Sequence, residues 1–172
     1  MLIGYRFITH NEKQTRWCLE HGADPNARNK NRYQDVPSLA GRFASASTWR
    51  LLASHGANFA RSNALQRAAE SRLKGRVDVL RWLIDEVGLP VNQREWEYDA
   101  AEFQNRRGSS LGAALHFAVL SGVPGHVQFL LERGCDINMP DTLGRTAWDW
   151  KPISGGEEVI AVLDNWKSNG SV

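Results

Sequence analysis

The stretch that decides the fold is Ala113–Pro140, AALHFAVLSGVPGHVQFLLERGCDINMP. Its pattern predicts a short helix over 114–120 and a turn rich in glycine and proline over 122–125. A second helix is predicted over 126–133, and Gly134 ends it because glycine readily adopts the left-handed conformation of a helix C-terminus. The segment is therefore predicted to be a helical hairpin.

This hairpin has more apolar surface than it can bury alone. Val127, Leu130 and Leu131 repeat at i, i+3 and i+4, which makes an apolar stripe on the second helix. On the first helix, Ala114 and Ala118 are one turn apart and leave a narrow face that another helix can approach closely. The pattern predicts neighbouring hairpins of similar build.

The sequence supplies such neighbours at a nearly fixed period. The glycines that end second helices are Gly22, Gly56, Gly88 and Gly134, separated by 34, 32 and 46 residues, and 33 further residues lead to Lys167. The pattern of the first helix also recurs, in NALQRAA (63–69), AALHFAV (113–119), TAWDWKP (146–152) and a degraded copy, DVPSLAG (35–41). Five units then account for nearly the whole chain, the first with a worn first helix over 1–11.

This pattern resembles the ankyrin repeat family, in which each unit of about 33 residues is a β-turn finger and two antiparallel helices. The residues that carry the resemblance are Leu115, His116, Ala118, Gly122, Leu130, Leu131, Gly134, Asp136 and Asn138, with Asp141, Gly144, Arg145 and Thr146 opening the next unit. The resemblance implies an all-α ankyrin-repeat solenoid that forms a single domain over 1–172. Its expected units are approximately 1–30, 31–60, 61–92, 113–140 and 141–167, with an insertion at 93–112.

Three features depart from the family pattern. Pro37 stands where the leucine of a first helix belongs, and four extra residues lengthen the turn around Lys74 and Gly75. The 93–112 segment adds about 13 residues to one finger. The segment VDVLRWLIDEVGLPVNQRE (77–95) also resembles divergent ankyrin units that are common in fungal proteins.

Some local roles can be predicted from single residues. Asn11 and Thr48 are placed to cap second helices. The family resemblance implies that His116 hydrogen-bonds backbone and ties fingers together, and repeat position gives His21, His55 and His126 structural roles too.

Composition excludes several classes of protein. The formal net charge of +2, from 21 basic and 19 acidic residues, argues against nucleic acid as the main partner. Cys18 and Cys135 are too far apart in a repeat stack for a disulfide, and neither a membrane-spanning stretch nor a secretory signal is visible. We expect a cytoplasmic or nuclear protein that is monomeric and needs no cofactor or metal.

Basic residues gather in three loops: Arg28, Lys30 and Arg32; Arg72, Lys74 and Arg76; Arg106 and Arg107. Solvated loops are the simplest interpretation of all three clusters. Binding of a phosphate or carboxylate group is the alternative.

The 93–112 insertion, QREWEYDAAEFQNRRGSSLG, is the least routine segment. Trp96, Ala100 and Phe103 share a helical face, which predicts a short extra helix in a segment too polar to be buried. A loop of this length is usually functional or disordered. We expect a lid or a partner contact.

The favoured function is a protein-interaction module that grips a protein partner in a concave groove, with the insertion reaching beside it. Residues at finger tips and late in first helices would make the contacts: Arg32, Tyr33, Arg42, Phe43, Phe59, Glu70, Arg72, Trp96, Tyr98, Leu120, Thr142, Leu143 and Arg145. Arginine and aromatic side chains are common among interface hot spots.

The alternative is a small-molecule enzyme, a cyclase, isomerase or condensing catalyst of specialised metabolism, with its pocket beneath the insertion. No known catalytic motif is present. The residues available for acid–base work and for holding an anion would be Glu95, Glu97, Tyr98, Asp99, Glu102, Arg106 and Arg107.

Overall fold

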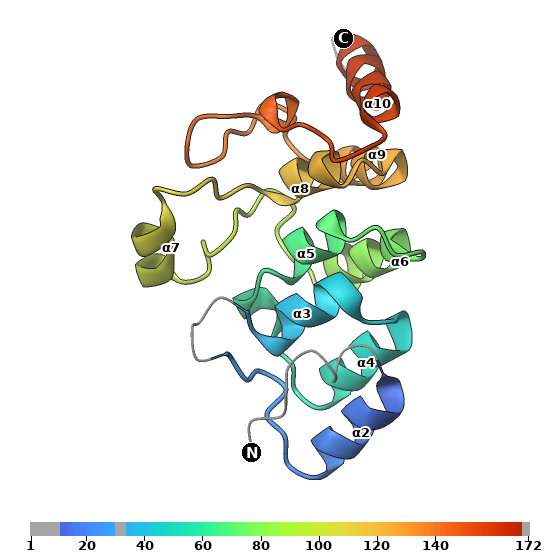
Figure 1. Ribbon diagram of the computed structural model, residues 1–172, viewed down its shortest axis with the longest axis vertical. Coiled ribbons are helices and arrows are strands. Elements are labelled where there is room, and N and C mark those ends of the chain that lie inside the picture. Colours follow the sequence, from blue (N-terminus) through green and yellow to red (C-terminus); the bar gives the residue numbers. More distant parts are fainter. Residues whose placement is uncertain (1–10, 30–33, 170–172) are drawn as a thin grey trace. The chain divides into compact units, whose positions relative to one another are not determined.

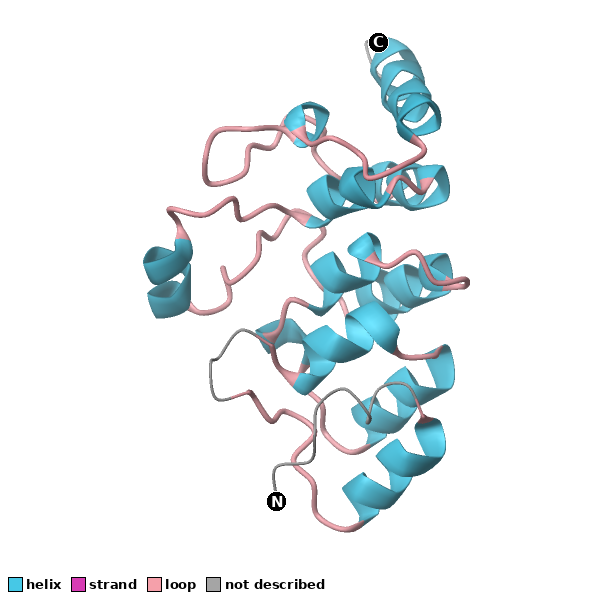
Figure 2. Cartoon of the chain, in the orientation of Figure 1, coloured by secondary structure: helices cyan, strands magenta, loops and turns pink. Residues whose placement is uncertain are grey.

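The computed structural model describes residues 11–29 and 34–169. In these residues, helices are joined by loops and turns, and there is no strand (Figures 1 and 2). The worn first helix predicted over 1–11 therefore lies almost entirely outside the described residues. The α-helices are α2 (Glu12–Glu20), α3 (Val36–Phe43), α4 (Ala46–Ser54), α5 (Ala64–Glu70), α6 (Arg76–Arg81), α7 (Ala100–Arg106), α8 (Ala114–Ser121), α9 (Pro124–Glu132) and α10 (Gly156–Asn169). Short helical turns are η1 (Phe59–Arg61), η2 (Trp82–Glu86, a π-helical turn) and η3 (Ala147–Asp149). The predicted all-α class is confirmed.

The chain divides into two compact units, Met1–Leu89 and Pro90–Val172, which we call unit 1 and unit 2. In unit 1 the first helices pack on each other, α3 on α5, and the second helices do the same, α2 on α4. Ala40, Ala64 and Ala68 are fully buried, and their small side chains allow the close approach of α3 and α5. This is the packing expected of hairpins stacked side by side.

Helix starts in unit 1 follow from their caps. The Asn11 side chain accepts a hydrogen bond from the Gln14 N–H, as predicted, and Asp35 caps α3 in the same way through Ser38. The predicted cap of α4 was wrong. Ser45, not Thr48, accepts the N–H bond there, and Thr48 lies buried in the first turn. Pro37 is tolerated because it lies in the first turn of α3, where a missing N–H costs nothing.

A buried arginine joins the two hairpins of unit 1. The Arg76 guanidinium donates to the carbonyl of Gly41 at 3.3 Å and to that of Ala44 at 2.5 Å. These carbonyls belong to the end of α3, where the last helical carbonyls lack partners within the helix. Burial lowers the pKa of Arg76, but a guanidinium group stays protonated in proteins, so the group is charged at neutral pH. One of the three basic residues in this turn is thus structural.

In unit 2, α8 and α9 form the hairpin that the sequence predicts. The second helix begins two residues earlier than predicted, because Pro124 occupies its first position, where proline is favoured. Next to this hairpin, η3 packs on α8 and α10 packs on α9, with Val159 and Leu163 of α10 fully buried. The last unit keeps the stacking arrangement although its first helix is a single turn.

The insertion contains the predicted short helix, α7, which Asp99 caps by accepting from the Glu102 N–H. Trp96 precedes this helix instead of sharing its face, and its φ of 66° is a left-handed value that is uncommon for a large side chain. The expectation that the segment is too polar to be buried was wrong for Glu95, Trp96 and Glu102, which are 5%, 5% and 9% exposed. The insertion therefore has a packed interior of its own.

An asparagine joins successive fingers in each unit. In unit 1 the Asn26 amide donates to the Gly56 carbonyl at 2.9 Å and accepts from the Asn58 N–H at 2.6 Å. In unit 2 Asn92 makes the same pair of bonds, to the Gly134 carbonyl at 3.2 Å and from the Asp136 N–H at 2.8 Å. We call this arrangement the asparagine clamp.

The clamp shows how the insertion is accommodated. Each clamp asparagine follows its closing glycine by four residues, and an antiparallel bridge two residues later, Arg28 to Asp35 or Arg94 to Ala113, closes the base of the finger. The insertion thus leaves the stack and returns to it through one bridge.

Replacing either clamp asparagine, in Asn26→Ala or Asn92→Ala, should lower the free energy of unfolding by about 1–2 kcal/mol, because two hydrogen bonds to backbone groups are lost. Urea denaturation measures this. Asn105→Ala, an exposed change on α7, is the control and should have little effect. Equal stability of all three variants and the unmodified chain would contradict the role of the clamp.

Two glycines with similar φ make a matched pair, Gly122 at 71° and Gly134 at 81°. A Cβ at Gly134 meets open space, whereas one at Gly122 would collide with the Ser154 carbonyl. Gly134→Ala should therefore cost about 1 kcal/mol from backbone strain alone, and Gly122→Ala at least about 2 kcal/mol more. Thermal unfolding compares them, and equal losses would show that the Ser154 contact is unimportant.

Candidate functional site

The residues predicted late in the first helices meet on the exposed side of α3 and α5 in unit 1. Arg42 Nη2 lies 3.0 Å from Glu70 Oε1, and Arg67 Nη1 lies 2.7 Å from Glu70 Oε2. The Arg42 guanidinium also lies 5.7 Å from the centre of the Phe43 ring. Arg67 is an addition that the sequence interpretation missed, although its spacing of three residues from Glu70 could have indicated the pair. We call these four residues the α3–α5 cluster.

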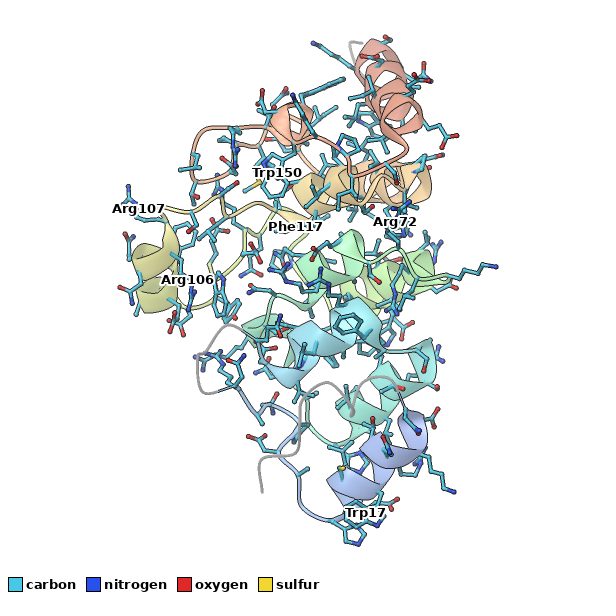
Figure 3. All side chains as sticks on the ribbon, viewed as in Figure 1. Trp17, Arg72, Arg106, Arg107, Phe117 and Trp150 are labelled. Carbon is cyan, nitrogen blue, oxygen red and sulfur yellow. The ribbon has the colours of Figure 1, made fainter. Side chains whose placement is uncertain are left out.

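The α3–α5 cluster is ordered but remains accessible. The Arg42 side chain is 40% exposed, that of Arg67 24%, and that of Glu70 15%. Arg72, which follows α5, is exposed (Figure 3). Three predicted contact residues thus lie together, with a fourth two residues beyond α5.

Phe59 does not belong to this surface. Its side chain is 3% exposed and packs against Trp49 at 4.8 Å and Trp82 at 5.2 Å between ring centres. These rings fill the space between the second helices and η1, so Phe59 stabilises unit 1 and is not offered to a partner. The predicted contacts Arg32 and Tyr33 lie outside the described residues.

In unit 2, the last finger is built on Asp141. This carboxylate accepts from the backbone N–H groups of Leu143 and Arg145, and from the side chains of Ser110, Arg145 and Trp150. Burial by itself would raise the pKa of Asp141, but these hydrogen bonds outweigh it and hold the pKa well below the usual range. A charged acceptor therefore fixes the finger.

The predicted contact residues around Asp141 differ in how far they are exposed to solvent. Leu143 is 52% exposed at the finger tip, and the Arg145 side chain is 46% exposed. The Thr142 side chain is instead hydrogen-bonded to the C-terminal part of the insertion. It donates to the Ser109 carbonyl and accepts from the Leu111 N–H. Leu120 is only partly exposed, late in α8. Leu143 and Arg145 are therefore the accessible members in this finger.

The His116 side chain connects the start of α8 to the last finger. Its Nδ1 accepts from the Ala113 N–H, which places the ring proton on Nε2, where it donates to the Arg145 carbonyl at 3.1 Å. Burial lowers the pKa of His116, which favours this neutral form. The predicted role of His116 in tying fingers together is seen in these bonds.

The residues considered for catalysis are engaged in holding the insertion. Glu97 pairs with Arg94 at 2.7 Å, Asp99 caps α7, and Glu102 pairs with Arg106 at 3.0 Å. Each of these carboxylates therefore has a structural partner within the insertion.

Burial and stacking account for most of the other candidates of the insertion. The Arg106 guanidinium lies 4.5 Å from the centre of the Trp96 ring, and the Trp96 and Tyr98 rings are 5.9 Å apart. Glu95 is buried with them. Arg107, at the end of α7, is exposed (Figure 3). Trp96 is thus interior, whereas Arg107 is accessible.

Neither a metal centre nor a membrane segment is found within residues 11–29 and 34–169. Three or more histidine, cysteine or carboxylate side chains do not gather there in a way that could hold a metal ion. Over the same ranges, every helix is too short or too polar to span a bilayer. Cys18 and Cys135 are buried free thiols.

Helical hairpins packed first helix on first helix, with fingers joined by side-chain amides, define a helix–turn–helix repeat protein. Residues 113–139 match the family model described as ankyrin repeat. The match assigns this part of the chain to the ankyrin repeat family. The matched residues are α8, α9 and the start of the last finger. The fungal-type resemblance of 77–95 stays a prediction. No curated protein matches the chain.

Replacing Asp141 by asparagine should destabilise unit 2 by about 2–3 kcal/mol at pH 7, because several hydrogen bonds to a charged acceptor are weakened. The folded-state pKa lies below that of the unfolded chain, so this stability is present above about pH 4 and is lost as the pH falls further. Chemical denaturation between pH 7 and pH 3 should show a shallower loss for Asp141→Asn than for the unmodified chain. Asp164→Asn, on the exposed side of α10, should follow the unmodified chain. Parallel pH profiles for all three would contradict this account of Asp141.

Proposed function

We propose that the chain is a protein-interaction module that binds a protein partner through the exposed side of its first helices and its fingers. The ankyrin repeat match over residues 113–139 supports a role in protein interaction. The observation that carries the choice of surface is the α3–α5 cluster, in which arginine side chains are held in place by Glu70 yet stay open to solvent.

Pre-ordering is what makes such a cluster suitable for binding. An arginine that is already paired loses less side-chain entropy when a partner covers it than a freely moving one. Arg42 also lies beside the Phe43 ring, so that a charged and an apolar contact are offered together. Both properties are those of interface hot spots.

The fingers contribute further contacts in each unit. Leu143 is a large apolar side chain exposed on a turn that Asp141 fixes. In the insertion, Arg107 is exposed at the end of a capped helix that packs on its own tryptophan. We propose these two as the contacts from unit 2, with Arg145 beside Leu143.

Two broader proposals accompany this function. The free, buried thiols of Cys18 and Cys135 suit a reducing compartment, so we place the protein in the cytoplasm or nucleus. We also propose that units 1 and 2 work as a single repeat domain, since the asparagine clamp has the same form in both.

The proposal is tested by capture from a cell extract with quantitative mass spectrometry. A partner retained by the unmodified chain should be reduced at least about tenfold by the triple variant Arg42→Ala, Arg72→Ala, Leu143→Ala, because these exposed contacts are lost while the core is untouched. The matched control carries Lys13→Ala, Arg50→Ala and Glu157→Ala on the exposed sides of second helices. Equal retention by both triple variants, or no saturable partner at all, would refute the proposal.

A further inference from the structure

A polar recess of about 360 Å³ lies in unit 1 and is formed by two successive fingers and the first turn of α3. The described residues that line it are Asn26, Arg28, Asp35, Pro37, Asn58 and Arg61. Five of these six side chains are polar. The recess therefore suits a charged or hydrogen-bonding group better than an apolar one.

The walls of the recess are held in place by bonds between the two fingers. The asparagine clamp joins Asn26 to the backbone of Gly56 and Asn58. Asn58 Oδ1 accepts from the Arg61 N–H at 3.2 Å, and Arg28 Nη2 donates to the Arg61 carbonyl at 3.4 Å. The two arginines are thus brought to one place from residues 33 apart in the sequence. A ligand would find this arrangement already formed.

Among the described lining residues, the charged side chains that reach solvent are arginines. Arg61 is exposed and Arg28 is partly exposed. Asp35, the carboxylic acid in the lining, is 3% exposed. Its Oδ1 accepts from the Ser38 N–H at 2.7 Å, and its Oδ2 is sealed from solvent and makes no hydrogen bond with the described residues. Burial raises the pKa of Asp35.

We propose that this recess takes a carboxylate side chain from an acidic segment of the partner protein. Guanidinium groups bind carboxylates through paired N–H donors, and a recess of this size holds an Asp or Glu side chain with its adjoining backbone. The two arginines among the described lining residues are too few to follow a phosphate backbone, and the net charge of +2 gives no broad basic face, so a protein fits better than nucleic acid. This inference rests on the proposed function and names the chemistry of one of its contacts.

The test uses a hexapeptide of alternating Asp and Glu with blocked ends, titrated into the ¹⁵N-labelled full chain. Saturable shifts are expected at the amides of Asn26, Arg28, Asn58 and Arg61. The Asn/Gln counterpart of the peptide should leave them unchanged. Arg61→Gln should weaken binding at least about fivefold, whereas Arg50→Gln, an equal change of charge on α4, should not. No saturable shift, or equal binding by both arginine variants, would overturn the inference.

Asp35 provides a second test in the opposite direction. Asparagine can still cap α3 through its side-chain oxygen but carries no charge, so Asp35→Asn should tighten peptide binding about three- to tenfold. Asp35→Ser, which also keeps a capping oxygen, should act in the same direction and guards against a folding defect of one variant. Weaker binding by both folded variants would contradict the proposed electrostatics.

Inorganic phosphate is titrated separately. Shifts of the same amides by phosphate, with none from the acidic peptide, would overturn the assignment to a protein carboxylate. Capture of a partner that ignores Arg61→Gln but is lost in the triple surface variant would refute this recess alone and leave the proposed function standing.

Discussion

The structure depends on the two hydrogen bonds that each clamp asparagine makes to the next finger. An asparagine amide can donate to a carbonyl and accept from an N–H at the same time. Both bonds form only if the two backbone groups of the next finger lie at the right distance, which fixes the register of the two fingers. Asn26 and Asn92 do so from the same place relative to their closing glycines. Helix packing supplies the attraction between hairpins, since it buries the apolar stripes, while the clamp selects the register.

Each unit adds a buried polar anchor to this arrangement. In unit 1 Arg76 satisfies carbonyls at the end of α3, and in unit 2 Asp141 gathers donors from the insertion, the last finger and Trp150. Both groups are charged and buried, so each is costly to leave unpaired. Their partners are mostly backbone groups or nearby side chains of the loops. The exposed contacts proposed for binding are therefore held on loops that the interior has already fixed.

The sequence predicted the helices well where apolar periodicity agrees with the capping, glycine and proline residues that start and end helices. The α8–α9 hairpin and the Asn11 cap of α2 follow from local pattern. The helix α7 was predicted from the spacing of Trp96, Ala100 and Phe103, of which the last two lie in it. The wrong cap of α4 shows the limit of such signals. Ser45 and Thr48 are both good capping residues, but Ser45 takes the cap and Thr48 lies buried in the first turn of α4.

The binding surface was less predictable, because the exposure of a side chain depends on contacts with residues that are far away in the sequence. Phe59 occupies a finger position that repeat analogy exposes, but Trp49 and Trp82 enclose it. Trp96 sits in a polar segment, yet a left-handed turn directs it inward beneath Arg106. The recess near Asp35 combines two fingers, so no local pattern marks Arg61 as the companion of Arg28.

Native-state hydrogen exchange of two finger amides tests the clamp most directly. The N–H groups of Asn58 and Asp136 lie in surface loops, where amides ordinarily exchange almost freely, but each donates to a clamp asparagine. The account predicts that both exchange at least about a hundredfold more slowly than an open loop, with protection that fails together with the adjoining helices. Exchange of both amides at the rate of an unstructured loop would contradict it.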